Sequence, residues 1–148
     1  MSTDATLAKS TPAPSITRAA AGSLITAVRA AAAEHGLEVA VAVTDVGGHL
    51  KAFERTDAAP FLSVDVAIDK AWTAASFRIP THVWNDYVAI PQFAPLAHHP
   101  HLMAVGGGYP ITENGNCIGG LGISGGTAEQ DREVAAAALT ALGFDLPD

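Results

Sequence analysis

The chain has 148 residues, of which 49% are hydrophobic and only 16% are charged. This length suits one domain, and the low charge predicts a homo-oligomer whose subunits bury apolar faces rich in small residues. Eight Lys and Arg against fifteen Asp and Glu give a formal charge of −7, and no segment gathers the basic residues. We therefore expect neither nucleic acid nor a membrane surface as a partner.

The N-terminal segment bears on the cellular location of the protein, and the cysteine content limits the disulfides and metal sites that the chain can form. Residues 1–14 are polar and interrupted by prolines, which predicts a disordered tail before a single domain at residues 15–148. No secretion signal and no run of about 18 apolar residues is present, which indicates a cytoplasmic protein. Cys117 is the only cysteine, so an internal disulfide and a thiolate-cage zinc or iron–sulfur site within one chain are excluded.

The first third of the chain predicts a helix and a hairpin. Apolar residues recur every three to four positions from Ser15 until Gly36, which predicts an amphipathic helix. Residues 39–43 are apolar on both faces of a strand, as in the centre of a sheet. Two glycines in the turn at residues 46–49 then predict a hairpin with a return strand over residues 50–55.

The middle of the chain predicts two helices and a long loop. Apolar spacing predicts a second helix over residues 61–77, which Pro80 ends. Thr81 is a candidate cap for a short helix through residue 87. Residues 89–100 contain three prolines and little periodicity, so we predict a loop of functional length.

The last third predicts three strands and a helix. Residues 102–105 fit a short strand, and Asn114-Gly115 is a strong hairpin signal between strands at residues 109–113 and 116–124. A capping box at Thr127 starts a helix through residue 142. The order predicts an α/β protein of the α+β class, with about five mostly antiparallel strands and helices packed on the sheet.

Three histidines crowd the predicted loop. His98, His99 and His101 surround Pro100, and imidazoles so placed suit an iron or transition-metal ligand or an acid–base pair. Because adjacent side chains of an extended segment point in opposite directions, the three rings are not expected to share one ion. The alternative is a solvated loop or a subunit contact. No metal site is assigned.

Two glycine-rich segments are candidate ligand-binding elements. The first follows the histidine loop, and its backbone N–H groups suit an oxyanion, although the pattern favours a tight turn or bulge that enters a strand. The second joins a predicted strand to a helix N-terminus, which suits either an anion or a simple cap. The residues concerned are Gly106, Gly107, Gly108, Tyr109 and Pro110 in the first segment, and Ser124, Gly125 and Gly126 in the second.

Charged residues near the first hairpin are the third candidate set. Arg55 could clamp a carboxylate at two points, and Lys70 could act as a point charge or a base. Asp45 and Asp57 are candidate ligand-binding residues beside them. The alternative is a network of ion pairs between the strand and the second helix.

Several ordered sequence blocks resemble the GlcG/HbpS-like family, which includes haem-binding and haem-degrading proteins and the C-terminal part of PduO. Together the blocks extend over about residues 15–143, nearly the whole chain. They are Val-Ala-Val-Thr-Asp-Val-Gly-Gly-His-Leu at 41–50, Phe-Glu-Arg-Thr-Asp-Ala at 53–58, Asp-Lys-Ala-Trp-Thr-Ala at 69–74, Gly-Gly-Gly-Tyr-Pro-Ile at 106–111, Asn-Gly at 114–115 and Gly-Gly-Leu-Gly-Ile-Ser-Gly-Gly at 119–126.

The resemblance implies a profilin-like fold that assembles into dimers and higher rings, often octamers. It also implies binding of haem or a corrinoid, and for some members a place beside small-acid or diol catabolism. The family has no universal haem-ligand motif, so the histidine loop remains a candidate from the residues alone. Since no secretion signal is present, the resemblance favours an intracellular catabolic role over an extracellular sensor.

Two functions follow from these observations. The first is binding of a small ligand or tetrapyrrole, with haem as a possible cofactor. The second is a cofactor-independent lyase, isomerase or hydrolase that acts on a small polar acid or a ring-derived catabolic intermediate. In this second hypothesis a loop histidine moves the proton, glycine N–H groups receive the anion, and Arg55 or Lys70 fixes the substrate.

Overall fold

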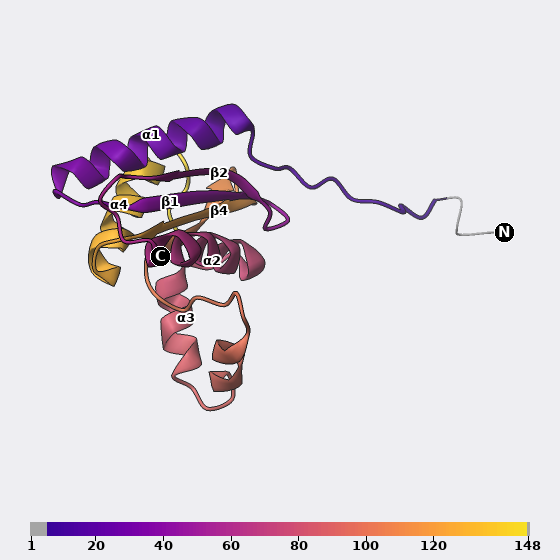
Figure 1. Cartoon of the computed structure of the whole chain (residues 1–148). Helices are drawn as coiled ribbons and strands as arrows, with labels where there is room; N and C mark the ends of the chain where they lie inside the picture. Colours follow the sequence, from indigo (N-terminus) through magenta and orange to yellow (C-terminus); the bar gives the residue numbers. More distant parts are fainter. Residues whose placement is uncertain (1–5, 148) are drawn as a thin grey trace.

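The computed structural model describes residues 6–147, and residues 1–5 and 148 lie outside it, including the first part of the predicted tail. Residues 7–15 are exposed, belong to no helix or strand, and lead away from the body of the molecule (Figure 1). The domain proper starts where the backbone N–H of Ile16 donates to the carbonyl of Ile118. None of the helices within residues 6–147 has the length and apolar character needed to cross a membrane.

Four antiparallel strands form one sheet in the order β2-β1-β4-β3. Both predicted hairpins are present, β1–β2 and β3–β4, and the two central strands β1 and β4 join them. Asn114 and Gly115 take positive φ values of 52° and 80° at the second turn. The strands are β1 (Ala40–Asp45), β2 (Leu50–Arg55), β3 (Gly108–Glu113) and β4 (Asn116–Ser124).

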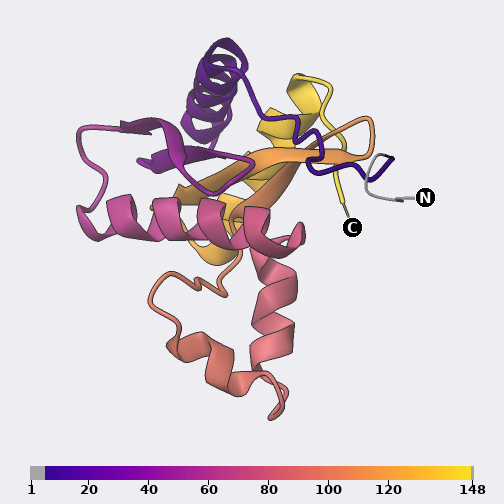
Figure 2. The same ribbon diagram turned by 90° about the vertical axis from the view of Figure 1, so that its right-hand side faces the viewer.

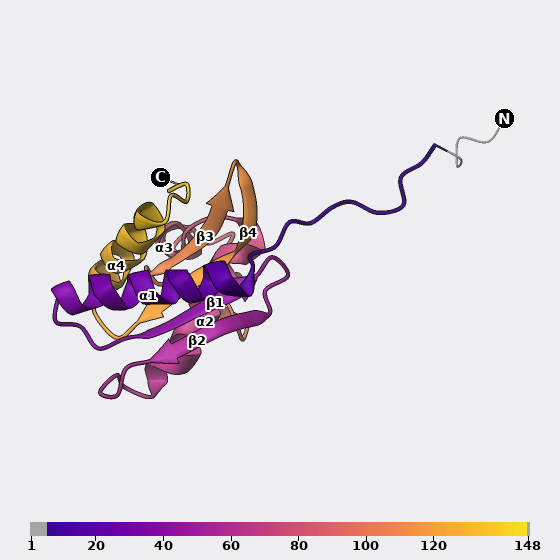
Figure 3. The same ribbon diagram turned by 90° about the horizontal axis from the view of Figure 1, so that it is seen from above.

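The helices cover both faces of the sheet. Helices α1 and α4 pack side by side on one face, and α2 packs on the other (Figures 1 and 3). The α3–η2 segment projects from the body below α2 as a limb (Figure 2). The helices are α1 (Arg18–Glu34), α2 (Leu62–Phe77), α3 (Thr81–Val88), the 3₁₀ helix η2 (Ala94–His98) and α4 (Ala128–Ala141).

The predicted profilin-like α+β class is confirmed, but the sheet has four strands instead of five. The predicted strand at residues 102–105 is absent. Its backbone groups bond to helix side chains instead: Met103 N–H donates to Thr73 Oγ1, and Asn85 Nδ2 donates to the carbonyl of Ala104. The predicted loop before it contains η2. Helix α1 begins later than predicted, because Thr17 and not Ser15 caps it.

The two faces of the sheet pack differently. Val41 and Val43 point toward α1 and α4 and join the large aliphatic core, whereas Ala40 and Ala42 point toward α2. On β4, a Cβ atom at Gly122 would overlap the carbonyl oxygen of Ala67. Small residues on both sides therefore let α2 lie directly on the strands. This close approach fixes which side chains of α2 face inward and which face solvent.

Candidate functional site

Helix α2 carries two polar clusters on opposite faces. Lys70 points toward β4 and α4 and is only 1% exposed. Its neighbour Asp69 lies on the outward side, where the histidine loop returns. Because consecutive helix residues are about 100° apart, adjacent positions can serve opposite environments.

The inward cluster is a buried ion pair. Lys70 Nζ donates to Asp131 Oδ2 at 3.1 Å and to the carbonyl of Ile123 at 2.8 Å, and Asp131 is 2% exposed. Asp131 Oδ1 also accepts the backbone N–H of Gly126 at 2.9 Å. Burial lowers the pKa of Lys70 and raises the pKa of Asp131, while their mutual attraction opposes both shifts. The pair ties α2, β4 and α4 together.

The triple glycine packs against this pair. A Cβ atom at Gly107 would lie 2.9 Å from Lys70 Nζ, and one at Gly108 would lie 2.6 Å from a methyl carbon of Thr81. The Gly108 N–H already donates to Thr81 Oγ1 at 2.8 Å. Here the glycines serve close packing. Of the three, Gly106 lines a cavity, as described below.

The second glycine segment is also closely packed, and one of its N–H groups is bonded within the chain. Gly125 has φ of +141°, and a Cβ atom there would overlap the carbonyl of Glu38. The Gly126 N–H is held by Asp131, and Ser124 ends β4 almost fully buried. The predicted capping box at Thr127 is confirmed, with Gln130 as its partner. The N–H of Gly126 is therefore occupied by the chain itself.

The charged residues near the first hairpin do not gather around Lys70. Arg55 and Asp57 are exposed at and beyond the end of β2, and no hydrogen bond or ion pair within residues 6–147 joins Arg55 to Lys70. Asp45 holds the hairpin turn, where its Oδ1 accepts the N–H groups of Gly47 and His49. Burial raises the pKa of Asp45, but these hydrogen bonds outweigh it, so the pKa is lowered.

The outward cluster, here called the Trp72 site, consists of Trp72, His99, His101 and Asp69. The His99 ring stacks on the indole with centroids 5.4 Å apart, and the His101 ring lies tilted at 5.7 Å. Thr73 Oγ1 donates to the carbonyl of His101 at 3.0 Å and so fastens the loop to α2. Both imidazoles are exposed.

Hydrogen bonds distinguish the histidines of the loop. His101 Nδ1 lies 3.2 Å from Asp69 Oδ1, and since a carboxylate only accepts, the neutral ring carries its proton on Nδ1. This leaves the Nε2 lone pair of His101 directed away from the carboxylate. His99 instead accepts the backbone N–H of His101 on Nδ1 at 3.3 Å. His98 ends η2 exposed and is not part of the cluster.

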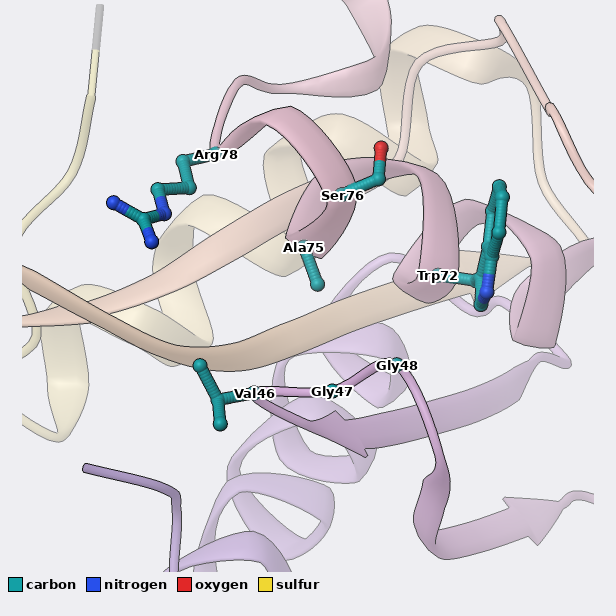
Figure 4. Close-up of a pocket in the computed structure, with 7 residues that line it drawn as sticks. All are labelled: Val46, Gly47, Gly48, Trp72, Ala75, Ser76 and Arg78. Carbon is teal, nitrogen blue, oxygen red and sulfur yellow. The ribbon is translucent and has the colours of Figure 1, made fainter. Parts of the chain in front are cut away.

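Two hollows meet at Trp72. One is lined by Trp72, Pro100 and His101 together with the acidic side of α2. The other lies between α2 and the Gly47-Gly48 turn, with Trp72 at one end and Arg78 at the other (Figure 4). A Cβ atom at Gly48 would lie 3.0 Å from the indole, so a side chain there would press on the ring.

A separate cavity surrounds His82. The ring contacts Tyr109 edge-on at 5.7 Å, and Asp86, Gly106 and Arg132 line the space with it. His82 Nδ1 is buried without a hydrogen-bond partner among the described residues. Burial and then the positive charge of Arg132 lower the pKa of His82, and Asp86 partly opposes them. Pro110, next to Tyr109, is buried in β3.

Sequence reasoning did not identify Trp72, Asp69 or Asp131 as site residues. The sequence could have indicated that Asp131 is buried, because it lies at helical spacing from Val134 and Ala138 on the buried face of α4. Asp69 and Trp72 lie in the Asp-Lys-Ala-Trp-Thr-Ala block of the family resemblance, but this block does not reveal the contact of Asp69 with His101, which is 32 positions away. Within residues 6–147, no group of three His, Cys, Asp or Glu side chains is placed to hold a metal ion.

Comparisons with known proteins agree with this architecture. A protein of 15.0 kDa encoded in the dhaT-dhaS intergenic region of Citrobacter freundii is 40% identical over 134 residues, which cover 88% of this chain and 94% of that protein. The structure of protein ORFY from Klebsiella pneumoniae is 35% identical and superimposes with a TM-score of 0.85, covering 90% of this chain and 94% of that one.

A third structure is a complex with haem. The PduOC:heme complex superimposes with a TM-score of 0.81 and is 29% identical. The match covers 90% of this chain and 99% of that one. The family model described as "Haem degrading protein HbpS-like" matches residues 16–140. The chain therefore belongs to the HbpS-like family.

Proposed function

We propose that this protein binds a tetrapyrrole, with haem as the first candidate, at the Trp72 site. The observation that carries the proposal is the His101–Asp69 pair. A carboxylate on Nδ1 orients the imidazole and leaves Nε2 available to bind iron. This donor set fits haem, because the Nε2 atom of His101 would hold the iron.

The surroundings of His101 suit a flat ligand. Trp72 presents an indole that already stacks with a planar ring, that of His99. Ile68 and Pro100 add apolar surface beside it. Bound haem would supply an iron centre, and the His101 imidazole with its hydrogen bond would tune the properties of that iron. The PduOC relative, which shares the fold, forms a haem complex.

The proposal extends to an intracellular catabolic setting and a homo-oligomer. An apolar hollow between the end of α2 and the α3–η2 limb supports self-association, because Phe77 at the end of α2 is 70% exposed there. Contiguous exposed apolar surface of this kind marks interaction sites. An octamer is the assembly that the family resemblance implies. The residues of the hollow are Phe77, Ile79, Trp84, Tyr87, Phe93 and Leu96.

A hemin titration followed by the Soret band tests the proposal. We expect saturable binding with one haem per subunit or per subunit pair, and at least about tenfold weaker binding with a shifted Soret band for His101→Ala. His98→Ala is the matched control and should bind as the wild type does. Non-saturable binding by the wild type, or an unchanged spectrum in His101→Ala, would reject the site.

The same pair supports a second candidate, an acid–base enzyme for a small polar acid or a ring-derived intermediate. A His–Asp pair with a free Nε2 is a suitable proton acceptor. The glycine N–H groups give this candidate less support, because those of Gly108 and Gly126 are occupied. A screen of small carboxylates with wild type and His101→Gln tests it: turnover that survives in the variant removes His101 from the reaction.

A further inference from the structure

Arg78 lines one end of the hollow that begins at Trp72, and its side chain extends away from Trp72 (Figure 4). The two residues lie at opposite ends of the space between α2 and the Gly47-Gly48 turn, with Ala75 and Val46 between them (Figure 4). One end therefore offers an aromatic surface and the other a guanidinium group. The hollow has a volume of about 270 Å³.

The backbone of Arg78 is unfavourable for an arginine. Arg78 follows the last residue of α2 in the left-handed conformation, with φ of 61° and ψ of 35°. After α1 and α4, the left-handed position is held by Gly36 and Gly143, with φ of 65° and 77°. Glycine takes this conformation without steric cost, whereas a residue with a Cβ atom is strained there. The sequence thus has an arginine where the fold favours glycine.

The guanidinium group of Arg78 is also uncommitted. Its side chain is exposed, and no hydrogen bond or ion pair to it is found among residues 6–147. Arg29, by contrast, is ion-paired and makes two 2.6 Å bonds to Glu54. Strained non-glycine residues persist where the surrounding structure or a function holds them. At position 78, arginine differs from glycine in having a charged side chain, and this is what a function could require.

We infer that Arg78 binds a carboxylate of the ligand whose flat ring system lies against Trp72. A guanidinium group matches a carboxylate with two parallel hydrogen bonds. The ligand class is then a planar ring system with an acidic side chain, and Arg78 is a specificity-determining residue. This inference rests on the proposed function and adds to it which chemical group of the tetrapyrrole is recognised.

The test compares hemin with hemin dimethyl ester, in which both carboxylates are blocked. The wild type should bind hemin about tenfold more tightly than the ester. Arg78→Gly should lose this preference, with hemin affinity about tenfold lower and ester affinity unchanged. It should also raise the Tm by about 3 °C, since glycine removes the backbone strain. Arg78→Lys should recover part of the preference.

Lys51→Gln is the matched control, because it removes one exposed positive charge from β2 away from the hollow. It should keep the wild-type preference for hemin. Equal binding of hemin and its ester by the wild type, or full hemin affinity in Arg78→Gly, overturns the role of Arg78 and leaves the proposed function standing. Failure of the wild type to bind either compound overturns both.

Discussion

The two faces of α2 show how one helix keeps a structural and a chemical site apart. Lys70 and Asp131 are almost fully buried, and three bonds from Nζ and the carboxylate oxygens link them to each other and to the backbone. Around Trp72 the imidazoles are exposed, and within residues 6–147 the Nδ1 atom of His101 has a hydrogen-bond partner but its Nε2 atom has none. Buried polar groups that bond to one another stabilise a fold, whereas an exposed group with an unused hydrogen-bonding atom can bind a ligand.

The small residues beneath α2 make this separation possible. Ala67 and Ala71 lie on Gly120 and Gly122 of β4 so closely that any added Cβ atom would meet a backbone carbonyl or amide. Such close contact locks the rotation of the helix about its axis. A fixed rotation places Lys70 inside and Asp69 outside, and so determines both sites at once.

The largest expected effect comes from breaking the buried pair. Lys70→Met leaves the Asp131 carboxylate buried without its cation, which should lower the free energy of unfolding by about 3–5 kcal/mol. Urea denaturation of the purified protein measures this loss.

A double variant tests whether the uncompensated charge is the cause. Lys70→Met combined with Asp131→Asn removes both charges and keeps an acceptor for the Gly126 N–H. It should be more stable than Lys70→Met alone. A double variant as unstable as the single one would show that lost packing, not the charge, destabilises the protein.

The close contact of α2 with the sheet gives the next effect. Gly122→Ala should lower the free energy of unfolding by about 1–3 kcal/mol or more, because its Cβ atom would overlap the Ala67 carbonyl. Gly22→Ala is the matched control: Gly22 lies in α1 with open space around it, so alanine should raise stability by up to about 1 kcal/mol. A neutral Gly122→Ala would contradict the locked rotation of α2.

The hairpins were predictable because their signals are local. Asn114-Gly115 fits the positive φ values that a tight turn needs, and the Thr127 capping box lies within four residues. Residues 102–105 are apolar, as a strand requires, but they do not form the predicted strand. Their backbone is held instead by Thr73 and Asn85, which are distant in the chain. Local pattern carries no information on such contacts.

The candidate site was predictable only in part. The crowding of histidines pointed to the loop, but the choice among them depends on Asp69, which only the folded chain brings near. Lys70 was read as a possible base or point charge, although its spacing with Ala67, Ala71 and Ala74 places it on the buried face of α2. A charged residue on an apolar helical stripe indicates a buried partner, and Asp131 lies on such a stripe too.

The His82 cavity offers a pH-dependent test. The lowered pKa of His82 means that the unfolded chain takes up its proton first as the pH falls. Stability should therefore decrease as the pH drops below about 6.5, the ordinary pKa of histidine, until the folded protein is protonated as well. His82→Phe should flatten this part of the profile, measured by urea denaturation between pH 5 and 8 in steps of about half a unit. An unchanged slope would remove His82 as its source.

The smallest effect on stability, and the sharpest contrast with Lys70, is expected at Asp69. Asp69→Ala removes a partner from a pair at the surface, in which the His101 side chain is 61% exposed and the Asp69 side chain 17%, so the free energy of unfolding should change by less than about 1 kcal/mol. Hemin affinity should nevertheless fall about 10–100-fold, because Asp69 orients the His101 ring. Asp69→Asn keeps an acceptor for Nδ1–H, so its hemin affinity should lie between those of the wild type and Asp69→Ala. If Asp69→Ala instead destabilises the chain as much as Lys70→Met, the outward face of α2 is also structural, and the separation of the two sites does not hold.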